Sequence, residues 1–133
     1  MLRIAAIAFT LALAALSGQT LAQDRTVHSV WVGSGVQDNG MSWTIEVTYY
    51  SDSSVEIAYP SLNCGGRLDL IGAEPSGGYR YRETLTYDQS GRCLDNGDVV
   101  LENLKPNELA YTYYYAGRPT VPGGTGQLRF ERN

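Results

Sequence analysis

The sequence predicts an all-β fold, in which an antiparallel meander of about eight strands forms a small barrel or sandwich held by one disulfide. Short stretches that alternate apolar and polar residues recur beyond residue 25, and turn residues separate them at hairpin length. No stretch after residue 22 has the 3.6-residue apolar period of a helix. Eight strands suffice to close a small barrel filled by its own side chains.

The first two expected strands flank a hairpin turn. The pattern predicts a strand over Thr26–Val32, after which Gly33-Ser34-Gly35 lets the chain turn or bulge. Gln37–Gly40 supplies residues that adopt positive φ in a hairpin. The second strand has the clearest alternation, and its apolar face consists of Trp43, Ile45, Val47 and Tyr49.

The third and fourth strands are expected on either side of a proline and glycine segment. Val55–Tyr59 ends at Pro60, because proline cannot donate to a strand ladder. Asn63 and Gly65-Gly66 then predict an unusual backbone path, with the glycines at positive φ. Leu68–Leu70 follows as a short fourth strand.

The fifth expected strand, Tyr79–Tyr87, carries one acid, Glu83, on its apolar face. Because an unpaired buried charge is costly, this acid predicts an ion pair with an arginine or a bulge that turns it outward. The candidate arginines are Arg67, Arg80 and Arg82. A ligand contact and a catalytic role are the further interpretations of Glu83.

Three strands complete the predicted sheet. They are expected at Val99–Glu102, Leu109–Ala116 and Gly126–Arg132. The last strand should point Leu128 and Phe130 inward, and a glycine and proline connection over Pro119–Gly126 should precede it.

Residues 1–22 have the three parts of a secretory signal peptide. Arg3 lies before the apolar run Ile4–Leu16, and Thr20-Leu21-Ala22 offers small residues for cleavage. The run is too short for a spanning helix, although a short membrane anchor is the alternative. We expect residues 23–133 to form a single β domain in the periplasm or outside the cell, without stable membrane insertion.

The two cysteines are expected to pair, since exported proteins fold in an oxidising environment. A Cys64–Cys93 bond would close a loop of roughly 30 residues and contribute about 3.5 kcal/mol. Neither a Cys-x-x-Cys motif nor a third ligand accompanies the cysteines, so we expect no metal and no cofactor. Asp95, Asn96 and Asp98 surround Gly97 as in a turn, and they lack the distal ligands of a calcium loop.

The charge balance argues against nucleic acid as a partner. The whole chain has a formal net charge of -4, and its lysine and arginine residues are scattered. Removal of Arg3, the only charged residue among residues 1–22, would leave it near -5. Phosphate backbones and anionic lipid surfaces would repel such a protein.

Three stretches occur in order along the chain: Tyr59-Pro60-Ser61-Leu62-Asn63-Cys64-Gly65-Gly66, then Arg82-Glu83, then Cys93 with Asp95-Asn96-Gly97. Together they resemble the signature of a poorly characterised bacterial domain. That family has a Tyr-Pro-Ser-Leu-x-Cys-Gly-Gly stretch, an Arg-Glu strand and a second cysteine before an acidic turn. The resemblance implies a small extracytoplasmic β domain, and it implies no activity. Here Asn96 stands where the family has glycine, and we expect the same turn because asparagine tolerates positive φ.

No catalytic apparatus is evident, and the chain is not expected to be an enzyme. Its only histidine, His28, is expected near the mature N-terminus, on the polar face of the first strand. Aromatic and arginine side chains favour a binding module that recognises a protein or a cell-envelope component, one version being an inhibitor of an envelope-acting hydrolase. The alternative is a small-ligand carrier with a pocket inside the barrel. The candidate binding residues are Tyr50, Arg80, Arg82, Glu83 and Tyr114.

Overall fold

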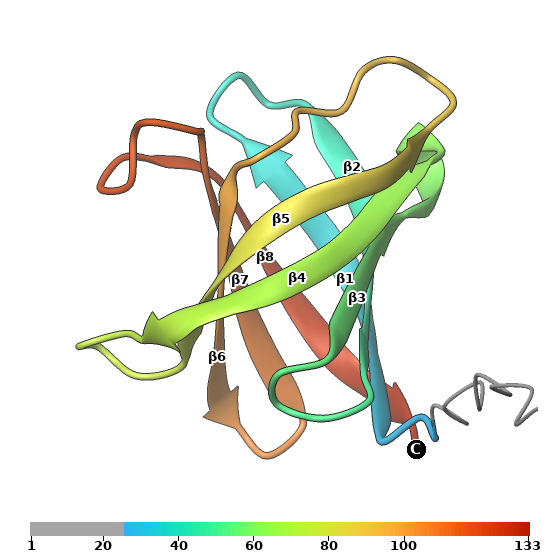
Figure 1. Cartoon of the computed structure of the whole chain (residues 1–133), viewed down its shortest axis with the longest axis vertical. Helices are drawn as coiled ribbons and strands as arrows, with labels where there is room; N and C mark the ends of the chain where they lie inside the picture. The colour runs from blue at the N-terminus through green and yellow to red at the C-terminus, as the bar shows by residue number, and fades with distance from the viewer. Residues whose placement is uncertain (1–25) are drawn as a thin grey trace, which may run out of the picture.

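The structure, a computed structural model, describes residues 26–133, which form a closed antiparallel barrel (Figure 1). Its strands are β1 (Ser29–Gln37), β2 (Ser42–Tyr49), β3 (Val55–Tyr59), β4 (Cys64–Ala73), β5 (Tyr79–Asp88), β6 (Asp98–Lys105), β7 (Glu108–Tyr114) and β8 (Pro122–Arg132), with the 3-10 turn η1 (Pro60–Leu62) after β3. Consecutive strands pair in order, and β8 closes the barrel against β1. The predicted meander is confirmed, and it is a barrel rather than a sandwich.

Every strand contributes apolar side chains to the barrel interior. The alternation predicted for β2 is confirmed, because Trp43, Ile45 and Val47 are buried. Phe130 was expected inside, and this was wrong. It is 36% exposed and contacts the Trp31 ring edge-on, with centroids 5.5 Å apart. Phe130 pairs with the core residue Trp31, but it lies near the end of β8, at the end of the barrel that carries the C-terminus.

Two strands are longer than predicted because glycines lie inside them. β1 continues through Gly33–Gly35, so the turn expected there is absent; β8 begins at Pro122, so the connection expected over Pro119–Gly126 lies at 115–121 instead. A Cβ at Gly33 would collide with the Gln127 carbonyl, and one at Gly35 would lie 2.9 Å from the Trp43 ring. These glycines therefore allow close approach of neighbouring groups within a strand.

Glycine also occurs at residues 65 and 66 because neighbouring groups approach the backbone closely there. The prediction of positive φ at Gly65 and Gly66 was wrong. Both belong to the extended strand β4, and a Cβ at Gly66 would collide with the Thr84 carbonyl. The unusual backbone predicted at Asn63 is confirmed, because its φ is 52°. Asn96 has a φ of 62°, as predicted for its turn.

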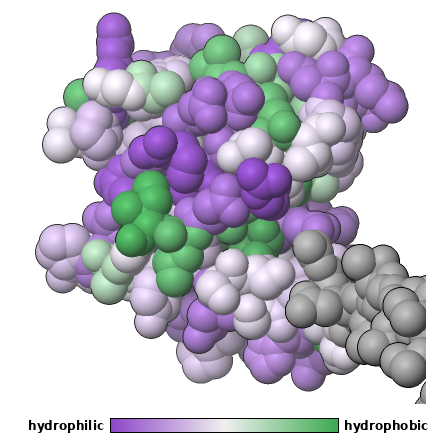
Figure 2. Space-filling view, viewed as in Figure 1, coloured by the Kyte–Doolittle hydropathy of each residue, from purple (hydrophilic) through white to green (hydrophobic). Residues whose placement is uncertain are grey.

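The barrel has two distinct ends. Loops 38–41, 60–63, 89–97 and 115–121 gather at one end, whereas loops 50–54, 74–78 and 106–107 lie at the other with the C-terminus (Figure 1). The wall between them is largely hydrophilic on the face shown in Figure 2, with its apolar residues in small groups. The loop-rich end contains the candidate site.

The predicted disulfide is confirmed. Cys64 and Cys93 are bonded, and their Cα atoms lie 6.5 Å apart. The bond ties the first residue of β4 to the 89–97 loop. The expected signal peptide, residues 1–22, lies outside the described residues. Residues 26–133 contain no helix with the length and apolar character that crossing a membrane requires.

Candidate functional site

A pocket of about 330 Å³ opens at the loop-rich end of the barrel, and we call it the mouth pocket. Aromatic side chains from β2, β3 and β7 line it, namely Trp43, Tyr59, Tyr111 and Tyr113. β5 contributes Glu83, η1 contributes Leu62, and the 89–97 loop contributes Arg92, Cys93 and Leu94. Small-molecule sites typically have this composition, an apolar and aromatic lining with few polar groups.

The position of Trp43 in the mouth pocket depends on two glycines in neighbouring strands. Its indole ring would lie 2.9 Å from a Cβ at Gly35 of β1 and 2.7 Å from one at Gly124 of β8. Side chains at these positions would therefore occupy the space of the ring. Because both residues are glycine, the large ring fits closely against these two strands, and Trp43 is 8% exposed.

Glu83 is the buried acid of the mouth pocket, with 1% of its surface exposed. Tyr59 donates its hydroxyl hydrogen to Glu83 Oε2 at 2.5 Å. The Tyr59 and Tyr111 hydroxyls lie 2.9 Å apart, and Tyr111 must be the donor because Tyr59 has only one hydrogen to give. A chain of hydrogen bonds thus runs from β7 through β3 to the carboxyl group on β5.

Burial raises the pKa of Glu83 from its ordinary 4.5 to about 7. The nearby charge of Asp95 acts in the same direction, whereas the hydrogen bond from Tyr59 lowers the pKa and only partly offsets the burial. Burial also raises the pKa of Tyr59 and Tyr111 well above the ordinary 10, so both phenols stay neutral at physiological pH. Glu83 is therefore the group in this network that titrates near neutrality.

Tyr113 brings a second polar atom to the mouth pocket. The residue is 8% exposed, and its buried hydroxyl has no hydrogen-bond partner among residues 26–133. The ring lies directly against Gly97, where a Cβ would collide with the hydroxyl oxygen. A buried hydroxyl without a partner is costly, and such groups in native proteins are rare enough to call for an explanation.

The rim of the mouth pocket is apolar and exposed. Met41 and Leu94 each have 54% of their surface exposed, and they belong to the 38–41 and 89–97 loops. Arg92 lies beside them and is exposed as well. The disulfide fixes this part of the rim, since Cys93 itself lines the pocket.

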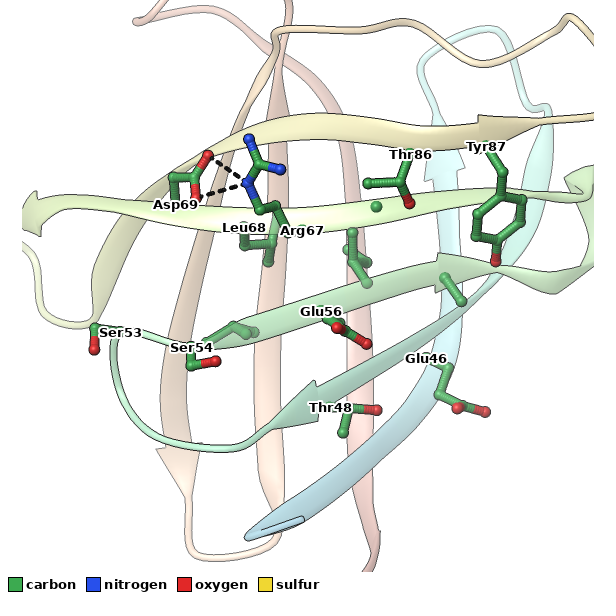
Figure 3. Close-up of a pocket in the computed structure, with 14 residues that line it drawn as sticks. Glu46, Thr48, Ser53, Ser54, Glu56, Arg67, Leu68, Asp69, Thr86 and Tyr87 are labelled. Atoms are coloured by element: carbon green, nitrogen blue, oxygen red, sulfur yellow. Dashed lines mark hydrogen bonds and ion pairs between the residues drawn. The ribbon is translucent and has the colours of Figure 1, made fainter. Parts of the chain in front are cut away.

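A second hollow, of about 440 Å³, lies on the outer wall of β2, β3, β4 and β5 (Figure 3), and we call it the outer groove. Its labelled side chains are mostly polar and include Glu46, Thr48, Glu56 and Thr86. Arg67 and Asp69, both on β4, pair at 3.1 Å on one side of it while more than half exposed. The outer groove is larger, but it lacks a buried polar group that could fix a ligand, so we favour the mouth pocket.

Three of the five predicted binding residues lie together, outside the barrel. Arg80 pairs with Glu74 and Asp98, and its guanidinium lies 4.5 Å from the centre of the Tyr114 ring. Arg82 pairs with the same Asp98 at 2.7 Å. Tyr50 lies in the loop at the opposite end of the barrel, where its hydroxyl contacts Glu56. Glu83 alone of the five lines the mouth pocket.

The arginine partner expected for Glu83 was wrong. All three candidates bond to other acids on the outer wall: Arg67 to Asp69, Arg80 to Glu74 and Asp98, and Arg82 to Asp98. Alternation along the strands is the physical reason, because Arg67 of β4 and Arg80 and Arg82 of β5 lie on outward faces while Glu83 faces inward. The side chain does not bulge outward either.

The sequence pattern placed Trp43 on the apolar face of its strand, but none of the pocket residues Trp43, Tyr59, Tyr111 and Tyr113 was among the predicted binding residues. The signal for a site was the combination of these aromatic residues with an acid on the same interior. Asp95 acts as expected for a turn, since its Oδ1 accepts hydrogen bonds from the backbone N–H groups of Leu85 and Asn96. A grouping of Cys64, Asp88 and Cys93 is no metal site, because the two sulfurs are bonded to each other.

Comparison of the chain with family models, with curated proteins and with solved structures finds no match.

Proposed function

We propose that the chain is a non-catalytic binding protein that holds a small molecule in the mouth pocket. The observation that carries this is the pairing of an aromatic-lined pocket with two buried polar groups: Glu83, of which one oxygen accepts from Tyr59 and the other has no hydrogen bond among residues 26–133, and the Tyr113 hydroxyl, which has no partner there. A stability-driven core would contain apolar residues at both positions. The proposal selects the carrier alternative among the two binding roles that the sequence favours.

The resembled motif supports the same location. Tyr59 and Leu62 of the Tyr-Pro-Ser-Leu stretch, the acid of Arg82-Glu83 and the second cysteine, Cys93, all line the mouth pocket. Gly97, in the acidic turn, gives Tyr113 the space it occupies. We infer that the family signature describes a binding pocket as well as a disulfide-stapled fold.

Catalysis is the weaker proposal for this site. A nucleophilic mechanism needs a base beside a nucleophile, and His28 lies at the far end of the barrel, where its backbone N–H donates to the Tyr49 carbonyl. We further propose that the protein acts in the periplasm or outside the cell, a location in which its disulfide would persist.

The exposed rim favours a second candidate function, recognition of a protein that inserts one side chain into the mouth pocket. Met41 and Leu94 offer apolar surface at the entrance, as protein interfaces do. Inhibition of an envelope-acting hydrolase is one form of this role, and it stays a prediction from charge and size.

Ligand occupancy of the mouth pocket can be tested with two bulky substitutions. Leu62→Trp places an indole in the mouth pocket, whereas Thr48→Trp places one in the outer groove as the matched control. Both variants and the native protein are incubated with a small-molecule extract of the producing cells and examined by native mass spectrometry. We expect a bound species in the native protein and in Thr48→Trp, and its loss in Leu62→Trp. Binding that survives in Leu62→Trp and disappears in Thr48→Trp would assign the outer groove instead.

A further inference from the structure

We propose, on the basis of the binding function above, that the mouth pocket takes an organic cation, a primary ammonium group on a small apolar body, with the ammonium group against Glu83. Four observations lead to this chemistry: the acid has no counter-charge, one of its oxygens is unused, the walls are aromatic, and the surrounding protein is acidic.

The missing counter-charge is the first observation. Glu83 is 1% exposed, yet no lysine or arginine pairs with it within residues 26–133. Arg92 is the basic residue of the mouth pocket, and it is exposed at the rim without an ion pair in the described part of the chain. Buried charges in proteins are normally paired, so a site that lacks the partner is suited to receive it from a ligand.

The unused oxygen of Glu83 gives the ligand a place to bond. Oε2 accepts from Tyr59, and the structure gives Oε1 no hydrogen bond with any residue between 26 and 133. A primary ammonium group has three hydrogens and no acceptor, so it can donate to Oε1 and to the lone pairs of the Tyr113 hydroxyl oxygen. One donor-rich group would thus satisfy both polar atoms that the fold leaves open.

The walls of the mouth pocket suit a cation better than an anion. Trp43, Tyr59, Tyr111 and Tyr113 line it, and the faces of aromatic rings attract ammonium groups. The chain has a formal net charge of -4, so the long-range field also favours a positive ligand. A neutral ligand would gain the apolar contacts but would leave the carboxylate unpaired.

The acidity of Glu83 sets the sign of the pH dependence. Burial raises its pKa to about 7, and only the ionised carboxylate attracts an ammonium group, so affinity for a cation falls as pH falls below 7. Three phenols face Glu83 and stay neutral, those of Tyr59, Tyr111 and Tyr113. The charged groups around it are Asp95 of the 89–97 loop and Arg92 at the rim. We expect roughly tenfold weaker binding at pH 6 than at pH 8.

Matched pairs of probes test the inference on the oxidised protein. Benzylammonium is compared with benzyl alcohol, and the lysine derivative Nα-acetyl-lysine methylamide with the norleucine derivative that lacks its ammonium group. Binding is followed by NMR, with the Trp43 indole N–H as the reporter of the mouth pocket. We expect the cation of at least one pair to bind at least tenfold more tightly than its neutral partner. Preference for benzylammonium indicates a free amine, and preference for the lysine derivative indicates a protein side chain.

Two variants connect the preference to its cause. Glu83→Gln keeps an oxygen that accepts from Tyr59 but removes the charge, so the cation preference should fall to less than threefold while neutral probes bind as before. Arg92→Ala removes positive charge from the rim and should preserve or strengthen cation binding.

Several outcomes would overturn the inference. Equal binding of charged and neutral probes at the Trp43 reporter would refute a cation ligand and leave the pocket function intact. Tighter binding at pH 6 than at pH 8 would indicate a neutral ligand that accepts a hydrogen bond from protonated Glu83. Loss of binding in Arg92→Ala with retention in Glu83→Gln would indicate an anion. No shift of the Trp43 reporter with any probe would also refute it, and the extract experiment would then decide the binding function separately.

Discussion

Replacement of Glu83 by glutamine should stabilise the protein above neutral pH. The pKa of Glu83 is about 7 in the fold against an ordinary 4.5, so the folded state holds a proton that the unfolded state has already lost between these two values. Stability therefore falls as pH rises through this window. At 1.36 kcal/mol for each pH unit, the ionised carboxylate lowers the free energy of unfolding by about 3 kcal/mol above pH 7.

The assay is urea unfolding of the native protein and Glu83→Gln from pH 4.5 to 8.5, followed by tryptophan fluorescence. The quantity of interest is the difference in unfolding free energy between the two proteins at each pH. It should change by about 3 kcal/mol in favour of Glu83→Gln between the two limits, which corresponds to roughly 10–20 °C in melting temperature for a domain of this size.

The pH dependence separates the effect of charge from that of shape. Glutamine has nearly the same volume and accepts the same bond from Tyr59, so packing changes should contribute equally at every pH. Glu131→Gln at the exposed end of β8 is the matched control and should leave the native profile in place. A difference between native protein and Glu83→Gln that stays constant from pH 4.5 to 8.5 would refute the raised pKa and, with it, the buried unpaired carboxylate.

Two further predictions concern the elements around Glu83. Replacing both Cys64 and Cys93 by serine should lower the free energy of unfolding by about 3.5 kcal/mol, because the disulfide closes a loop with a sequence separation of 29 residues. Thermal melts with and without reductant measure this effect. An unchanged melting temperature would show that the disulfide contributes nothing. Tyr113→Phe removes a buried hydroxyl that has no partner among residues 26–133, so it should leave stability unchanged or raise it by about 1 kcal/mol. Tyr111→Phe removes a hydrogen-bonded hydroxyl and should lower stability by about 1 kcal/mol. Urea unfolding measures both, and a Tyr113→Phe variant less stable than Tyr111→Phe would contradict the hydrogen-bond assignment.

The barrel could be predicted from the sequence because its signals are local. Alternation in Trp43–Tyr49 and the turn at Gly40, whose φ is 84°, each depend on a few neighbouring residues. Glycine caused the errors, since the same residue permits a turn and a close approach. Gly33 and Gly66 lie in strands because backbone from β8 and β5 passes directly over them, and this depends on contacts distant in sequence.

The mouth pocket could be predicted only in part for a related reason. The period of two placed Glu83 inside, and this was correct. The hydrogen-bond partner of Glu83 could not be read from the same pattern. Tyr59 lies 24 residues from Glu83 in the sequence, and Tyr111 lies 52 residues from Tyr59. Nearby arginines looked like partners in sequence, yet neighbours in a strand point to opposite faces of the sheet.

The Cys64–Cys93 disulfide and Glu83 lie at the same end of the barrel, and their expected effects on the free energy of unfolding have opposite signs. The ionised carboxylate is expected to lower the free energy of unfolding by about 3 kcal/mol, and the disulfide to raise it by about 3.5 kcal/mol. Cys93 and Glu83 both line the mouth pocket, so the disulfide constrains the 89–97 loop next to the buried acid that lowers stability. A methionine in place of Glu83 would make the fold more stable with less covalent support. Retention of a costly acid beside its compensating bond is expected where the acid serves a ligand, since functional sites are where local stability is given up.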